Sequence, residues 1–150
     1  MEYEKEVSYK IDLVNSALNN VKSLHLSENN DFLIDLSFNY KHYIKYSLKK
    51  LDCINIDLIL TSDALQIDVD RVNEAFVWSD KQVIEDKNVI ENFIKMLFTS
   101  TIKVKYCGPH YTKLYFFDDQ RHCVKTLKYI TGLYLKIGCK TKEYQPIYTK

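Results

Sequence analysis

The chain has 150 residues, of which 46% are hydrophobic and 27% are charged, and its formal net charge is +1 at pH 7. These values are typical of one globular domain and exclude global disorder. No charged start precedes an apolar run, so the sequence predicts neither a signal peptide nor a membrane-spanning helix. We therefore expect a cytoplasmic protein in which the four cysteines are small buried residues more often than disulfide partners; they are Cys53, Cys107, Cys123 and Cys139.

Residue usage is rich in Lys, Asn, Ile and Tyr, which indicates AT-rich coding in a low-GC bacterium or an AT-rich virus. Three glycines cannot form a Walker loop or a GxGxxG turn, so a glycine-rich phosphate site has no support. Residues 101–150 hold ten Lys and Arg against three Asp and Glu, or +7, which leaves −6 for residues 1–100. This division is typical either of two surfaces with different partners or of two parts that neutralise each other within one fold.

The first half of the chain predicts one helix followed by strands. A helix is expected from about Tyr3 to Lys22, because apolar residues recur at helical spacing at Val7, Ile11, Val14, Leu18 and Val21. Alternating apolar residues predict strands over 32–40, 54–60 and 65–69, and we assign the first part of 41–51 as a strand although a helix also fits it. The stretch TSDA, residues 61–64, predicts an antiparallel hairpin with Leu60 opposite Leu65.

The second half predicts another helix and further strands. Ser79 or Asp80 can cap a helix over 78–100, and strands are expected over 102–106, 112–117, 123–128 and 133–139. The tail 142–150 is expected to be irregular or an edge strand. The predicted fold class is α+β, with two amphipathic helices packed on a largely antiparallel, meander-like sheet in a single domain, 1–150. A degenerate helix-then-strands duplication, about 1–78 and 79–150, is the alternative organisation.

The stretch YCGPHYTKLYFFDDQRHC, residues 106–123, contains the residue types of a zinc site. Cys107 and His110 stand at one end, and His122 and Cys123 at the other. Successive side chains of a strand point to opposite faces, so His122 and Cys123 cannot both bind one ion. We expect a turn at GPH and neither a metal nor another cofactor; Cys107 and His110 are the weak candidates for a metal site.

The predicted hairpin places acidic residues opposite one another on its polar face. Asp57 stands opposite Asp68, and such a like-charged pair costs roughly 0.2 to 1 kcal/mol on a solvated sheet. A solvated or internally paired face, a divalent cation and a basic partner surface remain open as explanations. The predicted partner-binding acidic face consists of Asp57, Asp68, Asp70 and Glu74.

The C-terminal strands predict a basic, aromatic face directed away from the core, consisting of Lys103, Lys105, Lys113, Tyr115, Lys125, Tyr134 and Lys136. Lysines interleaved with tyrosines can bind the phosphates and stack on the bases of single-stranded nucleic acid. Because the sequence lacks an RRM signature and contains only Arg71 and Arg121 as arginines, we keep nucleic-acid binding as the alternative function.

No motif predicts an enzyme, since neither Cys107 nor Cys123 has the sequence context of a catalytic nucleophile. The leading hypothesis is a small, non-catalytic protein-binding module, such as an immunity or antitoxin-like protein that covers a basic partner with its acidic face. The expected partner is therefore another protein, with nucleic acid as the alternative and no membrane partner.

Overall fold

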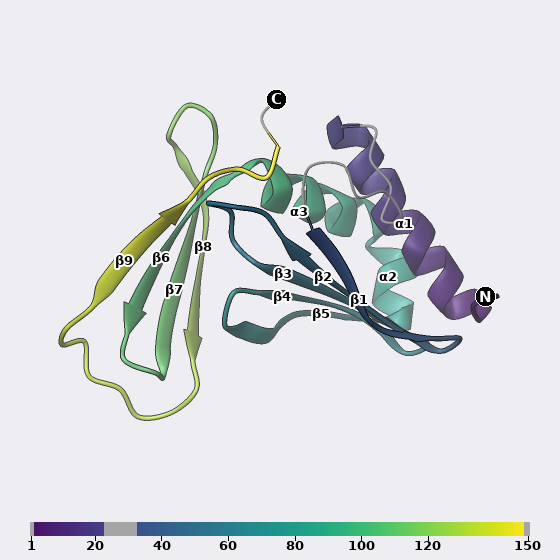
Figure 1. The fold of residues 1–150 in the computed structure, drawn as a ribbon, viewed down its shortest axis with the longest axis horizontal. Helices are drawn as coiled ribbons and strands as arrows, with labels where there is room; N and C mark the ends of the chain where they lie inside the picture. The colour runs from purple at the N-terminus through teal and green to yellow at the C-terminus, as the bar shows by residue number, and fades with distance from the viewer. Residues whose placement is uncertain (1, 23–32, 149–150) are drawn as a thin grey trace.

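The computed structural model describes residues 2–22 and 33–148, which form an α+β fold (Figure 1). The elements are α1 (Lys5–Lys22), β1 (Leu33–Tyr40), β2 (Tyr43–Lys49), β3 (Ile56–Thr61), β4 (Ala64–Val69), β5 (Val72–Ser79), α2 (Asp80–Glu85), α3 (Lys87–Thr99), β6 (Thr101–Cys107), β7 (Tyr111–Phe117), β8 (Cys123–Ile130) and β9 (Lys140–Tyr144). The strands form two antiparallel sheets, ordered β1-β2-β3-β4-β5 and β8-β7-β6-β9. The predicted fold class is confirmed, although the strands divide between two sheets.

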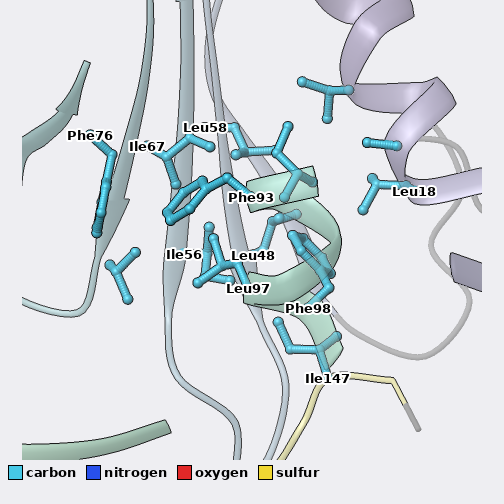
Figure 2. Packing of buried hydrophobic residues seen from close by; sticks show 14 of the residues in the cluster. Leu18, Leu48, Ile56, Leu58, Ile67, Phe76, Phe93, Leu97, Phe98 and Ile147 are labelled. Carbon is cyan, nitrogen blue, oxygen red and sulfur yellow. The ribbon is translucent and has the colours of Figure 1, made fainter. Parts of the chain in front are cut away.

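The helices lie on one face of the first sheet (Figure 1). Figure 2 shows Phe93 and Leu97 of α3 pointing towards apolar side chains of this sheet, and the rings of Phe93 and Phe76 are 4.6 Å apart between centroids. Leu18 of α1 joins the same core, which also includes Ile147 near the C-terminus. Burial of this continuous apolar core is the main force that holds helices and sheet together.

The second predicted helix is divided into a short α2 and a longer α3. Ser79, one of the two residues expected to cap this helix, is the N-cap of α2. Its side chain accepts a hydrogen bond from the backbone N–H of Gln82, and the side chain of Gln82 accepts one from the backbone N–H of Ser79. Asp86 then interrupts the helix with a backbone φ of −109°. The two long amphipathic helices of the protein are thus α1 and α3.

The predicted hairpin register in the first sheet is confirmed, since Leu60 pairs with Leu65 and Asp57 pairs with Asp68. Strand β5 was not predicted. Its sequence lacks clear alternation, because Asn73, Glu74 and Ala75 are exposed in succession and the ladder with β4 is irregular there. Glu74 has a positive φ of 61°, which only a local irregularity of the strand accommodates.

The prediction of a strand over 133–139 is wrong. These residues belong to the loop that joins β8 to β9, and β9 follows at Lys140–Tyr144 as an edge strand paired with β6. The alternation of Leu133, Leu135 and Ile137 resembled a strand, but all three side chains are exposed. The edge of β6 that residues 133–139 would need for pairing is already paired with Lys140–Tyr144.

The interpretation of the cysteines is partly wrong, because Cys107 and Cys139 form a disulfide. Tyr106 of β6 pairs with Lys140 of β9. Because the strands are antiparallel, this pairing places Cys107 beside Cys139. Cys53 is buried and free, as expected, whereas Cys123 is free and exposed.

No helix in the described part of the chain is long and apolar enough to cross a membrane. A cytoplasmic location stays a prediction, and a stable disulfide is more common in oxidising compartments.

Candidate binding surfaces

The first sheet carries an open face on the side away from the helices. The strand pairs place one row of side chains across all five strands of this face: Phe38, Lys45, Ile59, Gln66 and Val77. A second row begins with Tyr40 opposite Tyr43. Phe38, Tyr40 and Val77 are 47%, 55% and 43% exposed, which is high for large apolar side chains. We call this side of the sheet the open face.

Three of the four predicted acidic residues lie together at one end of the open face. Asp57 and Asp68 are directly opposed, and the backbone N–H of Glu74 donates a hydrogen bond to the Asp68 carboxylate at 3.2 Å. Asp68 is nearly buried and also accepts a bond from Gln66 Nε2 at 2.8 Å, so its charge is largely satisfied within the protein. Asp57 remains partly exposed, and its ion pair with Lys45 is long, at 3.8 Å.

Asp70, the fourth predicted acidic residue, lies instead at the junction between the two sheets. Its carboxylate accepts a 2.6 Å hydrogen bond from the hydroxyl of Tyr106, and burial together with this bond raises the pKa of Tyr106. The neighbouring Arg71 donates hydrogen bonds to the side chain of Thr112 and to the carbonyl oxygens of Gly108 and Tyr111, each at 2.6 to 2.7 Å. The turn between β4 and β5 is thereby fastened to the second sheet, a structural role that uses Asp70 and Arg71 together.

The outer face of the second sheet carries a lysine row across three adjacent strands. Lys105 of β6 pairs with Lys113 of β7, which in turn pairs with Lys128 of β8. Lys103 pairs with Tyr115 on the same face, and its other neighbour, Glu143, is held by Arg121 at 3.0 Å. Like charges directly opposed are unfavourable on an isolated sheet, so an anionic partner would relieve repulsion along the lysine row.

The remaining residues of the predicted basic face divide between two sides. Lys125 lies on the opposite, inner face, because it pairs with Phe116 and its Nζ lies 5.6 Å from the ring centre of Phe93. Leu127, two residues further along β8, lies on the same face and packs against the core, so ordinary strand alternation places Lys125 on the inner face. Tyr134 and Lys136 belong to the loop after β8, and both contact the ring of Tyr111.

The residues that suggested a zinc site lie at opposite ends of the second sheet. The sulfur of Cys107 is bonded to Cys139 and is not available as a thiolate ligand. Nδ1 of His110 is 3.0 Å from the hydroxyl of Thr131, whereas His122 lies beside Asp118 at 3.7 Å. The expected turn at Gly108–His110 is present, and Gly108 has the positive φ of 65° that favours glycine.

Sequence reasoning missed a buried charged cluster between α1 and the start of α2. The side chain of Lys10 is fully buried, and its ammonium group donates to the Asp80 carboxylate at 2.7 Å and to the carbonyl oxygens of Glu6 and Thr61. Tyr9 also donates to Asp80, and these two hydrogen bonds hold the pKa of Asp80 below its usual range. The signal was the position of Lys10 on the helix, three residues after Val7 and four before Val14, within the apolar stripe.

Neither of two cavities lined by described residues includes the Lys10 cluster. One, of about 620 Å³, lies between the turn at Gly108–His110 and the loop residues Leu133–Leu135. The other, of about 800 Å³, lies between α1, α3 and the turn after β7. Among residues 2–22 and 33–148, no three His, Cys, Asp or Glu side chains are placed to hold a metal ion together.

No protein-family model, no curated protein and no solved structure matches this chain.

Proposed function

We propose that this protein is a non-catalytic binding module that presents the open face of the first sheet to another protein. The observation that carries the proposal is the exposure of Phe38, Tyr40 and Val77 on one uncovered sheet face. Exposed apolar and aromatic side chains that gather on one surface mark protein interaction sites. Tyrosine and phenylalanine are also suited to such contacts because they bury a large area with few rotatable bonds.

The charges beside this apolar group favour a partner with a basic surface. Asp57 is partly exposed, and its ion pair with Lys45 is too long to neutralise it fully. Glu74, which is exposed, adds a second carboxylate at the same end of the face. A basic partner would pair with both groups at the rim while its apolar side chains cover Tyr40 and Val77. An immunity or antitoxin-like role, in which the module covers a basic toxin domain, is the form of this function that we favour.

Single-stranded nucleic acid is the weaker candidate for this protein. The lysine row supplies the cations that phosphates require. The tyrosine rings beside it are less suitable for stacking bases, because Lys113 lies over the ring of Tyr115 at 4.8 Å and Tyr134 packs on the buried Tyr111. Base stacking requires open ring faces, so the geometry supports protein binding better.

The test is affinity capture from the native source with the tagged protein, followed by quantitative mass spectrometry. We expect one protein at a stoichiometric level, and we expect Tyr40→Asp or Val77→Asp to abolish its capture. Ile84→Asp and Val89→Asp are matched controls, because both side chains are more than half exposed on the helices that cover the other face of the sheet.

Two results would refute the proposal. In the first, no protein is captured at a stoichiometric level by the wild type. In the second, a captured protein is retained equally by the Tyr40→Asp and Ile84→Asp variants, which would place its binding site away from the open face. The melting temperature of each variant is measured in parallel, so that loss of capture by an unfolded variant is recognised.

A further inference from the structure

The loop between β8 and β9, residues 131–139, exposes large apolar side chains at the far end of the second sheet. Leu133 is 97% exposed, Ile137 is 76% exposed and Leu135 is 74% exposed, and Ile130 at the end of β8 is 48% exposed. Figure 1 shows that this loop projects away from the helices and from the first sheet. We call residues 131–139 the apolar loop.

The apolar loop is held in place by contacts at both of its ends and in its middle. The Cys107–Cys139 disulfide fastens its last residue to β6, and the Thr131 N–H donates to the His110 carbonyl oxygen at 2.9 Å. In the middle, Tyr134 packs on the ring of Tyr111, with 4.9 Å between the ring centres. The exposed leucines are therefore presented outward by a fixed backbone, which lowers the entropy cost of binding them.

Alternate residues of the loop have opposite environments. Tyr134 and Lys136 both lie against Tyr111, with Lys136 Nζ 5.3 Å from the ring centre. The residues between and beside them, Leu133, Leu135 and Ile137, are the highly exposed ones. The even-numbered side chains anchor the loop, and the odd-numbered ones form an apolar tip.

The charged residues that the second sheet and the loop contribute around this tip are all basic. Neither residues 101–117 nor residues 120–142 contain an Asp or a Glu. Five lysines lie on the strands beside the tip or on the loop itself: Lys105, Lys113, Lys128, Lys136 and Lys140. Lys140 pairs with Tyr106, whose side chain faces the first sheet, so cations lie on both sides of the projecting end.

From this arrangement we propose that the apolar loop inserts into the surface of an anionic lipid bilayer, with the five lysines binding the lipid phosphates. An apolar tip enters the interface between headgroups and acyl chains, while surrounding cations are attracted to anionic lipid. A nucleic acid would pair with the lysines but would leave Leu133, Leu135 and Ile137 in water. The sequence predicted no membrane partner because it lacks a spanning helix, and attachment through a loop requires none.

This inference is independent of protein binding by the open face, and vesicle co-sedimentation tests it. The probes are vesicles of phosphatidylcholine alone and vesicles of phosphatidylcholine mixed with phosphatidylglycerol. We expect binding to the mixed vesicles that weakens as salt is added, and much weaker binding to phosphatidylcholine alone.

Two double variants separate the apolar and the electrostatic contributions. Leu133→Ser with Leu135→Ser should weaken binding to mixed vesicles by at least tenfold, on the order expected for withdrawing several methylene groups from the bilayer. Lys128→Ser with Lys140→Ser should weaken it by about 25-fold, since each lysine near an anionic surface contributes about fivefold. Leu51→Ser and Lys81→Ser are the matched controls, because these side chains are 88% and 82% exposed on other parts of the protein and should bind as the wild type does.

A direct reading of insertion comes from Leu135→Trp, whose new indole should shift its fluorescence to shorter wavelength on mixed vesicles and be quenched by brominated lipid. Trp78, the natural tryptophan, packs on Phe93 in the core and should not respond. Absence of binding to mixed vesicles would overturn the proposal, and so would wild-type binding by the two-leucine variant. Tight binding of an oligothymidylate without vesicle binding would assign the lysine row to nucleic acid instead.

Discussion

The buried Lys10–Asp80 pair provides the sharpest test of the energetics of this fold. Lys10 belongs to α1, whereas Asp80 is the first residue of α2, so their 2.7 Å contact joins the N-terminal helix to the end of the first sheet. The two partners differ in burial: the Lys10 side chain is fully buried, and that of Asp80 is 36% exposed. This asymmetry determines which single substitution costs more.

Asp80→Asn leaves the Lys10 ammonium group buried without a counter-charge, although carbonyl oxygens still surround it. We expect this variant to lose about 3 kcal/mol of unfolding free energy, at the low end for breaking a buried pair. Lys10→Met leaves a carboxylate that water can reach, so its expected cost is smaller, about 2 kcal/mol. The double variant leaves no uncompensated charge and should cost about 3 kcal/mol, which implies a coupling free energy of about 2 kcal/mol.

Urea unfolding of the four proteins at neutral pH measures these differences from the midpoints at a common slope. The reasoning is refuted if Lys10→Met is the more destabilising single variant, or if the two single costs simply add. The pH dependence gives a second reading. Because the pKa of Asp80 is lowered in the folded state, its contribution is present above the unfolded value near 3.8 and is lost as the pH falls through the lower folded value. Asp80→Asn should remove this part of the pH dependence of the unfolding free energy.

Three further outcomes are expected at the junction between the sheets and at the cysteines. Arg71→Lys should lower the unfolding free energy by about 2 kcal/mol in urea, because an ammonium group cannot reproduce the three bonds of the guanidinium group; an unchanged midpoint would mean that these bonds contribute nothing net. Reduction of the Cys107–Cys139 disulfide, which joins residues 32 apart, should cost about 3 to 4 kcal/mol by loop entropy, and equal midpoints with and without reductant would contradict the bond. In the oxidised native protein, iodoacetamide should modify exposed Cys123 well before Cys53, because burial raises the pKa of the Cys53 thiol; equal rates by peptide mass mapping would contradict that burial.

Local patterns predicted the features that depend on neighbouring residues. The register that opposes Asp57 and Asp68 followed from alternation on both sides of a turn, and it is the register observed. The cap at Ser79 followed from residue type at the start of an apolar stripe. In both cases the determining contacts lie within about ten residues along the chain, where sequence reasoning is strongest.

Features that depend on distant parts of the chain were missed or misread. The alternation at Leu133–Ile137 predicted a strand, but whether a strand forms depends on an available edge, and β9 already occupies the edge of β6. Lys125 was predicted on the outer face, but it shares the inner face with Leu127, where its Nζ lies over the ring of Phe93 from the distant helix α3. The buried position of Lys10 was not predicted, because its partner Asp80 lies 70 residues further along the chain.

The uneven charge along the chain is related to the separation of the two proposed surfaces. The carboxylates Asp57 and Glu74 lie on the first sheet, whereas the acid-free end of the second sheet carries the apolar loop and its lysines. The Arg71 and Asp70 bonds join the sheets through several short contacts, which favours a fixed angle between the surfaces. A protein that bound lipid at one end and a basic partner on the open face would therefore hold that partner in a defined orientation at the membrane. Tyr40→Asp should then abolish partner capture and leave vesicle binding unchanged, while the Leu133→Ser and Leu135→Ser variant should do the reverse; a variant that lost both would show that the two surfaces are not independent.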